Sequence, residues 1–265
     1  MPAIVTLLSD FGSHSPYPAQ MKAVLAASCD AVFIDITHDV PRHDVRTGAY
    51  LLAAVAPTTP AGTVHLAVVD PGVGTARHPL IVTGGGQFFV GPDNGLLLPA
   101  AKRLGGPRVF QMNAQGIGEE KVSPTFHGRD LFAPAAARLV AGTPPQRLGR
   151  PTTEFVDLDL GASRQNGAAV VGHVIYVDGF GNLITTIPSS TLAADGRSVH
   201  VMVGRKRSAA TLERTYGDAA PGRVVIVPGS DGLLEVAVRE GSAAEHFAAS
   251  VGTSVRIEAL PKKHR

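Results

Sequence analysis

Three aspartates in the first hundred residues each stand where an apolar run ends. Asp10 follows "IVTLLS", Asp70 follows "VHLAVV", and Asp93 lies in "FFVGPDNG". In an open sheet covered by helices, ligands bind beyond the carboxyl ends of the strands. A single aspartate at such a position can equally cap a helix or close a turn. Three of them together favour a binding or catalytic site.

In the stretch "VVDPGVGTARHP", a turn separates the carboxylate of Asp70 from a basic residue, Arg77. Asp70 enters a turn that contains Pro71, Gly72 and Gly74, and Arg77 follows the turn. Neither this turn nor "TGGGQ" has the spacing or the lysine of a phosphate-binding loop, so a nucleotide phosphate site is not predicted.

A second concentration of polar groups lies in "SPTFHGRD". His127 precedes Arg129 and Asp130, which open an apolar helical stretch. His127 could be only a loop residue, and Asp130 only a charge at a helix start. An imidazole that titrates near neutral pH beside a cation is nevertheless what proton transfer requires. Among the other histidines only His38, in "DITHDV", has polar neighbours, and a loop role is favoured for it.

The stretch "DGFGNLITTI" places Asp178, Phe180 and Asn182 on a bend punctuated by glycines. Phe180 could belong to an ordinary core and Asn182 to an ordinary turn. The functional alternative is an aromatic face that stacks on a base, beside an amide that reads the edge of that base. A purine without phosphates would suit this pair.

Composition narrows the class of protein. The chain has 265 residues, 44% of them hydrophobic and 17% charged, and a formal net charge of +2. This charge gives no field that would attract nucleic acid, so no nucleic-acid partner is expected. Neither a signal peptide nor a membrane span is expected in "MPAIVTLLSDFG". The lone cysteine, Cys29, fits buried packing in a reducing cytoplasm.

Elements of two kinds must position these residues. Up to about residue 160, apolar strands alternate with helical patterns such as "PYPAQMKAVLAAS" and "VRTGAYLLAAV", which predicts an α/β domain with a largely parallel sheet and helices on both faces. "PLIVTGG" and "QFFVGP" predict a hairpin within it. Residues 161–265 contain short strands separated by Gly, Ser, Asp and Pro, which predicts a smaller antiparallel β-domain.

Six blocks, taken in order, make the chain resemble a known family. "SDFG", "VDPGVGTARHPL", "GPDNGLL", "FHGRDLFAPAAA", "DGFGNLITTI" and "GSDGLLEVAV" span nearly the whole sequence. Together they look like the S-adenosyl-L-methionine hydroxide adenosyltransferase family, which is related to fluorinase and chlorinase. The resemblance implies a β-barrel-like second domain and a homotrimer whose sites lie between subunits. It also implies hydrolysis of S-adenosyl-L-methionine at the ribose C5′, which gives adenosine and L-methionine.

The resemblance also assigns roles to residues. The water-activating set of the family matches Asp70, Arg77 and His127. The residues expected to bind substrate are Asp10 at the ribose diol, Asn182 at the adenine, Asp178 at the methionine ammonium, Ser230 at its carboxylate, and Phe180 packing in the same pocket. Ser15, Asp231 and Leu233 depart from the pattern of the family.

No cofactor or metal is expected. A sulfonium is already a good leaving group, and neither a Cys/His ligand set nor an HExxH or GxSxG motif is present. Two other functions stay open. A halogenase would need a small dehydrated halide pocket, against which the water-activating residues argue. A non-catalytic adenosine- or S-adenosylmethionine-binding protein would retain the fold without turnover.

Overall fold

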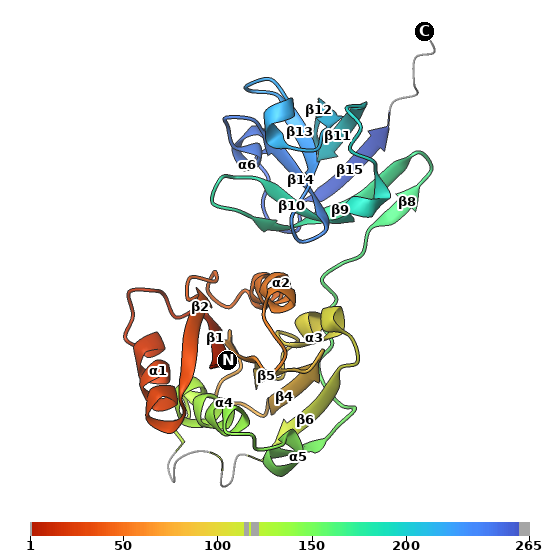
Figure 1. The fold of residues 1–265 in the computed structure, drawn as a ribbon. Coiled ribbons are helices and arrows are strands. Elements are labelled where there is room, and N and C mark those ends of the chain that lie inside the picture. Colours follow the sequence, from red (N-terminus) through yellow and green to blue (C-terminus); the bar gives the residue numbers. More distant parts are fainter. Residues whose placement is uncertain (1, 114–116, 118–121, 260–265) are drawn as a thin grey trace. The chain divides into compact units, whose positions relative to one another are not determined.

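The computed structural model describes residues 2–113, 117 and 122–259. The chain forms two compact units, Met1–Leu158 and Asp159–Arg265. Figure 1 shows helices around a sheet in the first unit and a barrel of strands in the second. The predicted combination of an α/β domain with a smaller β-barrel-like domain is confirmed. In the described part of the chain, no helix has the length and apolar character needed to cross a membrane.

The first unit is built on a mixed sheet. Its strands are β1 (Ala3–Ser9), β2 (Ala31–Thr37), β3 (Val64–Val68), β4 (Pro79–Gly84), β5 (Gln87–Pro92), β6 (Arg108–Met112) and β7 (Gly149–Pro151). They lie in the order β2-β1-β3-β5-β4-β6-β7. The four strands β2, β1, β3 and β5 run parallel, whereas the β4–β5 hairpin reverses the chain and makes the β4, β6 and β7 pairings antiparallel. The parallel half carries the strand ends at which the candidate aspartates lie.

Helices cover both faces of this sheet. They are α1 (Tyr17–Ser28), α2 (Val45–Val55), α3 (Leu98–Leu104), α4 (Ala133–Val140) and α5 (Pro145–Leu148), with the short turns η1 (Ala56–Thr58) and η2 (Gly128–Phe132). α1 packs against α4, and α2 packs against α3 on the opposite face (Figure 1). β1 is buried by both layers: Leu7 joins the core beneath α1 and α4, whereas Leu8 approaches Gly48 of α2. This explains why β1 is a continuous apolar run.

The second unit is a closed barrel. Its strands are β8 (Arg164–Asn166), β9 (Ala169–Val177), β10 (Leu183–Pro188), β11 (Ser198–Val203), β12 (Lys206–Leu212), β13 (Val224–Pro228), β14 (Leu233–Val238) and β15 (Ser254–Ala259). The order is β10-β14-β13-β12-β11-β15-β9-β8, and a β9–β10 pairing closes seven of the strands into a ring. All pairings are antiparallel except β12–β13. The closed ring removes the exposed strand edges that an open sheet would have.

Three short elements of the second unit were not predicted from sequence. β12 begins with charged residues and alternates weakly, yet its pairing with β11 buries Ala210 and Leu212. The turn η4 (Tyr216–Asp218) and the helix α6 (Ala243–Phe247) are too short to show a period. Each is stabilised locally, α6 by a hydrogen bond from the Glu245 N–H to the hydroxyl of Ser242.

Candidate active site

Asp70, Arg77 and His127 form one hydrogen-bonded chain. The Nε of Arg77 donates to both carboxylate oxygens of Asp70, at 3.0 and 3.1 Å, and its Nη2 also donates to Oδ2. The same Nη2 lies 2.7 Å from Nδ1 of His127, a residue fifty positions further along the chain. The side chains of Asp70 and Arg77 are only 5% and 9% exposed. The guanidinium therefore joins an anion and an imidazole in a largely water-excluded position.

The turn after β3 reaches His127 because of one glycine. Gly74 has φ +76°, a conformation that other residues rarely adopt, and a Cβ on it would lie 2.6 Å from the carbonyl oxygen of Pro124. The turn therefore lies directly against the segment that precedes His127. Hydrogen bonds from the N–H and the hydroxyl of Thr75 to the carbonyl of Gly72 hold the turn in shape.

The histidine side of the cluster is built on an unusual helical turn. η2 is a π-helical turn, in which the N–H of Ala133 bonds to the carbonyl of Gly128. This spacing places the fully buried ring of Phe132 edge-on to His127, with 6.4 Å between ring centroids. The guanidinium carbon of Arg77 lies 5.2 Å from the centre of the same ring. Phe132, which sequence reasoning missed, thus forms an apolar wall behind both groups.

The electrostatics of His127 follow from this setting. Burial, and then the positive charge of Arg77, lower the pKa of His127 below its ordinary value, although Asp70 and Asp130 oppose the shift. The imidazole is therefore neutral at pH 7. Because its Nδ1 accepts a hydrogen bond from Arg77, its single ring proton sits on Nε2. His127 thus offers a hydrogen-bond donor on its free side.

Asp10 lies at the end of the strand next to Asp70. β1 pairs in parallel with β3, with Ser9 opposite Val68, so both aspartates follow the same edge of the sheet. The Oδ2 of Asp10 accepts a hydrogen bond from the backbone N–H of His43, at 2.9 Å. Among the described residues, none donates to Oδ1 of Asp10. One oxygen is thereby fixed and the other keeps its capacity for a ligand.

Two other charged residues named in the sequence have structural contacts. The Oδ1 of Asp93 accepts from the backbone N–H of Val156, at 2.8 Å. Asp130 pairs with the adjacent Arg129 and accepts from the N–H of Ser123. Asp93 therefore ties the end of the first unit to β5, and Asp130 closes the loop before η2.

The second unit contributes a pocket of about 670 Å³. It is lined by residues that include Asp178, Phe180, Asn182, Tyr216, Ser230 and Glu235. All four candidates that the sequence placed in this unit therefore line one pocket. Phe180 is 82% exposed, whereas Asn182 is only 8% exposed. An apolar ring standing in solvent beside a buried amide offers a stacking face and a reading group side by side.

Asp178 organises the bend that carries this pair. Its Oδ1 accepts from the N–H groups of Phe180 and Asn182, at 2.9 and 2.8 Å, and its Oδ2 accepts from the Nδ2 of Asn182 at 2.9 Å. Asp178 therefore both stabilises the turn and lines the pocket. Because the amide nitrogen of Asn182 faces Asp178, the amide oxygen is left for another partner.

Sequence reasoning missed two lining residues, Glu235 and Tyr216. The hydroxyl of Tyr216 donates to Oε2 of Glu235, which is 9% exposed. Burial raises the pKa of Glu235, the Tyr216 hydrogen bond opposes this, and the nearby charges of Asp178 and Asp231 add to it. A glutamate in an otherwise apolar alternation, "LLEVAV", was the available signal. Across the described ranges, no group of three or more His, Cys, Asp or Glu side chains is arranged to hold a metal ion.

Two family models match the chain. The SAM hydroxide adenosyltransferase N-terminal domain matches residues 5–149, and the SAM hydroxide adenosyltransferase C-terminal domain matches residues 172–256. The two matches fall in the first and the second unit respectively.

Individual relatives are similar over almost their full length. A protein of Salinispora tropica named (R)-S-adenosyl-L-methionine hydrolase is 41% identical over 96% of this chain and 97% of its own. A protein of the same name from Thermus thermophilus is also 41% identical, over 96% and 98%. Fluorinases are more distant, at 27% identity for that of Nocardia brasiliensis. The crystal structure of an uncharacterized conserved protein from Thermotoga maritima matches with a TM-score of 0.91 and 34% identity, over 96% of this chain and 99% of that one.

Proposed function

The chain belongs to the SAM hydroxide adenosyltransferase family, and we propose that it hydrolyses S-adenosyl-L-methionine to adenosine and L-methionine. Water attacks C5′ of the ribose, and the C5′–S bond breaks. Its electrons stay on sulfur, so the sulfonium becomes the neutral thioether of methionine. The oxygen of water becomes the 5′-hydroxyl of adenosine, and one proton is released.

The observation that carries the proposal is the hydrogen-bonded group of Asp70, Arg77 and His127. The leaving group needs no activation, so the difficulty of the reaction lies in aligning a weak nucleophile and removing its proton. An anion and a neutral imidazole, both held by one guanidinium, are suited to that task. Arg77 also favours hydroxide character in the attacking oxygen because it supplies a buried positive charge.

The hydrogen-bond directions suggest separate roles for the two partners of Arg77. The Nε2–H of neutral His127 donates to the attacking oxygen and orients one of its lone pairs. The carboxylate of Asp70 keeps lone pairs beyond those that Arg77 uses, and it accepts the proton that the water loses. His127 is in this scheme an orienting donor, and Asp70 is the base.

The remaining contacts hold the substrate. The free oxygen of Asp10 binds the ribose diol, and the amide oxygen of Asn182 accepts from the exocyclic amine of adenine. Phe180 covers the base. Asp178 meets the methionine ammonium, and Ser230 meets its carboxylate, both at the pocket of the second unit. Glu235, in the same pocket, adds a second carboxylate on the side of the ammonium.

Three further features of the proposal rest on the family resemblance and on the sequence. The proposed reaction needs no cofactor, because the sulfonium of the substrate is already a good leaving group. It assembles as a homotrimer, with active sites between subunits, and it acts in the cytoplasm. Sedimentation tests the trimer: a monomer that stays fully active at high dilution would contradict it.

The decisive experiment is incubation with S-adenosyl-L-methionine in oxygen-18 water. Label in the 5′-hydroxyl of adenosine, with unlabelled methionine, is the expected result. Methylthioadenosine together with labelled homoserine would show attack on the methionine chain and defeat the proposal. No turnover at all would favour the non-catalytic binding protein. Formation of 5′-halo-5′-deoxyadenosine in the presence of halide would favour the halogenase. The sequence identity of this chain to fluorinases is lower than its identity to the hydrolases.

A further inference from the structure

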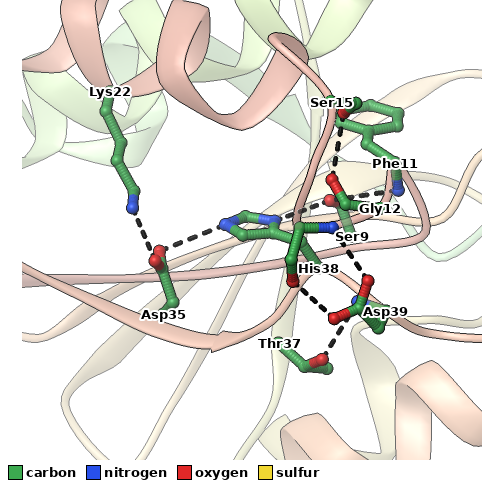
Figure 2. A network of polar contacts seen from close by, with 10 residues as sticks. Ser9, Phe11, Gly12, Ser15, Lys22, Asp35, Thr37, His38 and Asp39 are labelled. Carbon is green, nitrogen blue, oxygen red and sulfur yellow. Dashed lines mark hydrogen bonds and ion pairs between the residues drawn. The ribbon is translucent and has the colours of Figure 1, made fainter.

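A buried histidine lies directly behind the segment that carries Asp10. His38, which is 5% exposed, follows β2, and its Nδ1 lies 2.7 Å from the hydroxyl of Ser9 at the end of β1. Ser9 is fully buried. The Nε2 of His38 lies 3.1 Å from Oδ1 of Asp35, and Asp35 pairs with Lys22 at 2.5 Å. Figure 2 shows these side chains in one continuous polar network.

The ionised carboxylate of Asp35 sets the hydrogen-bond directions in this network. Although partial burial raises the pKa of Asp35, hydrogen bonds from Lys22 and His38 bring it below its ordinary value, so the carboxylate is ionised and can only accept. In the His38 tautomer whose Nε2 donates to this carboxylate, Nδ1 accepts from the Ser9 hydroxyl. Ser9 is buried and already bonded, so the arrangement is not that of a nucleophile and its base.

The network is connected to both neighbours of Asp10. The oxygen of Ser9 accepts from the N–H of Phe11 at 3.4 Å, and the carbonyl of His38 accepts from the N–H of Gly12 at 2.7 Å. Further along the same loop, His43 donates its backbone N–H to Asp10 itself. His43 has φ +64°, a conformation that a non-glycine residue holds only where the surroundings fix it. The loop after β2 holds the Asp10 segment further through the N–H of Val40, which donates to the carbonyl of Ser9, and through Asp39, which accepts from the N–H of Ser13.

We propose that the Ser9–His38 pair is a positioning device that aims the free carboxylate oxygen of Asp10 at the ribose diol of the substrate. The inference rests on the proposed function, in which Asp10 binds the ribose. Neither Ser9 nor His38 touches the substrate. They act through Asp10, and their loss weakens recognition of the two ribose hydroxyls rather than binding in general.

The same strand offers a matched control. The hydroxyl of Thr6 on β1 lies 2.7 Å from Nδ1 of His65, and Nε2 of His65 lies 2.8 Å from Oε1 of Gln87. Thr6 and His65 are also buried, at 1% and 0% exposed. This second hydroxyl–histidine pair has the same chemistry, but these hydrogen bonds do not reach the segment around Asp10. Loss of its bond therefore shows how much the removal of such a buried hydrogen bond changes ligand binding by itself.

The test compares adenosine with 2′,3′-dideoxyadenosine, which lacks both hydroxyls. Calorimetry on the full chain gives the ratio of the two dissociation constants for the wild type, Ser9→Ala, His38→Asn and Thr6→Val. We expect Ser9→Ala to weaken adenosine binding about fivefold to tenfold, the equivalent of one lost hydrogen bond, and to leave the dideoxy ligand nearly unchanged. The Oδ1 of Asn can replace Nδ1 as the acceptor for Ser9, so His38→Asn should retain most of the ratio. Thr6→Val should retain all of it.

Equal weakening of both ligands in Ser9→Ala, or the same change of ratio in Thr6→Val, would overturn the inference alone. A wild-type protein that binds both nucleosides equally well would overturn it together with the ribose role of Asp10. These measurements need no turnover, so a failure of the oxygen-18 experiment is separate from them. An effect of Ser9→Ala that disappears in an Asp10→Ala background would support the inference further, because the two residues then act as one unit.

Discussion

The candidate residues of the two units differ in how far other residues of the protein already bond to them and cover them. In the first unit, the side chains of Asp70 and Arg77 are only 5% and 9% exposed and are bonded to each other, and His127 bonds to Arg77. In the pocket of the second unit, Phe180 stands 82% exposed. The first arrangement is organised before any ligand arrives, which suits chemistry. The second has apolar surface to be covered, which suits binding. Substitutions in the two units should therefore affect different kinetic constants.

The largest effect is expected in the first unit. Asp70→Ala should lower the single-turnover rate by about 10²–10⁴-fold, because a positioned base typically contributes that much. His127→Ala should lower it by about 10²–10³-fold, because it removes the donor that orients the attacking oxygen. The dissociation constant of substrate should change much less, since the attacking water interacts most strongly in the transition state. Combining Asp70→Ala with Arg77→Ala should cost little more than the worse single change.

Asp93→Asn is the matched control for these variants. Asp93 also follows a strand of the sheet, but its carboxylate bonds to the backbone of Val156, and asparagine retains that acceptor. Turnover in Asp93→Asn should stay close to the wild-type rate. If the Asp70 and His127 variants turned over normally once saturated with substrate, the division between the two units would be wrong.

An effect on affinity is expected in the second unit. Asn182→Ala should raise the dissociation constant of adenosine about tenfold, because it removes a buried hydrogen-bond acceptor for the base. The rate at saturation should change little. Purine riboside, which lacks the exocyclic amine, supplies the control, and its affinity should be similar for wild type and variant. A large loss of saturated rate in Asn182→Ala would break the comparison.

The pH dependence should report the first unit. The pKa of His127 is lowered by burial and by Arg77, so the imidazole is mainly neutral at pH 7 and turnover is expected to change little between pH 7 and pH 8. Below its pKa, His127 gains a proton on Nδ1, can no longer accept from Arg77, and faces a like charge. Turnover should then fall about tenfold per pH unit. If the fall in turnover at low pH were centred above pH 6.5, or if it persisted in His127→Gln, a group other than His127 would be responsible for it.

The smallest effect is expected from chelation. Activity after dialysis against a chelator should equal that of untreated protein, because the sulfonium leaving group needs no Lewis acid. The assay is turnover before and after treatment, with each divalent metal added back in turn. Loss of activity that one metal restores would show that the cluster of the first unit is incomplete as described.

Local patterns predicted the elements well where they were long and apolar. β1, α2 and the β4–β5 hairpin were recognisable because a buried strand, an amphipathic helix and a glycine turn each leave a signal within a few residues. β6, β12 and α6 left weak signals. Their stability comes from pairing and packing partners distant in sequence, which a local window does not contain.

The candidate site was predicted in part for the same reason. The turn at Asp70 and the bend at Asp178 are local, and residue types alone pointed to them. Phe132 and Tyr216 were missed because a phenylalanine in an apolar helix and a tyrosine in a short turn have no distinguishing local pattern, and the one signal for Glu235, a charge in the apolar run "LLEVAV", does not show what the glutamate contacts. Only the π-helical turn η2 and the approach of η4 to β14 make them neighbours of the site.

The sequence by itself determined the class of each unit, the strand ends that carry Asp10 and Asp70, and membership of a family through six ordered blocks. The tertiary structure decided which of these groups meet. Arg77 reaches His127 across fifty residues because Gly74 lets the turn lie against Pro124, and His43 reaches Asp10 because β2 pairs with β1. Contacts of this kind depend on close packing between segments that are far apart in the chain, and hydrophobic periodicity carries no record of which segments those are.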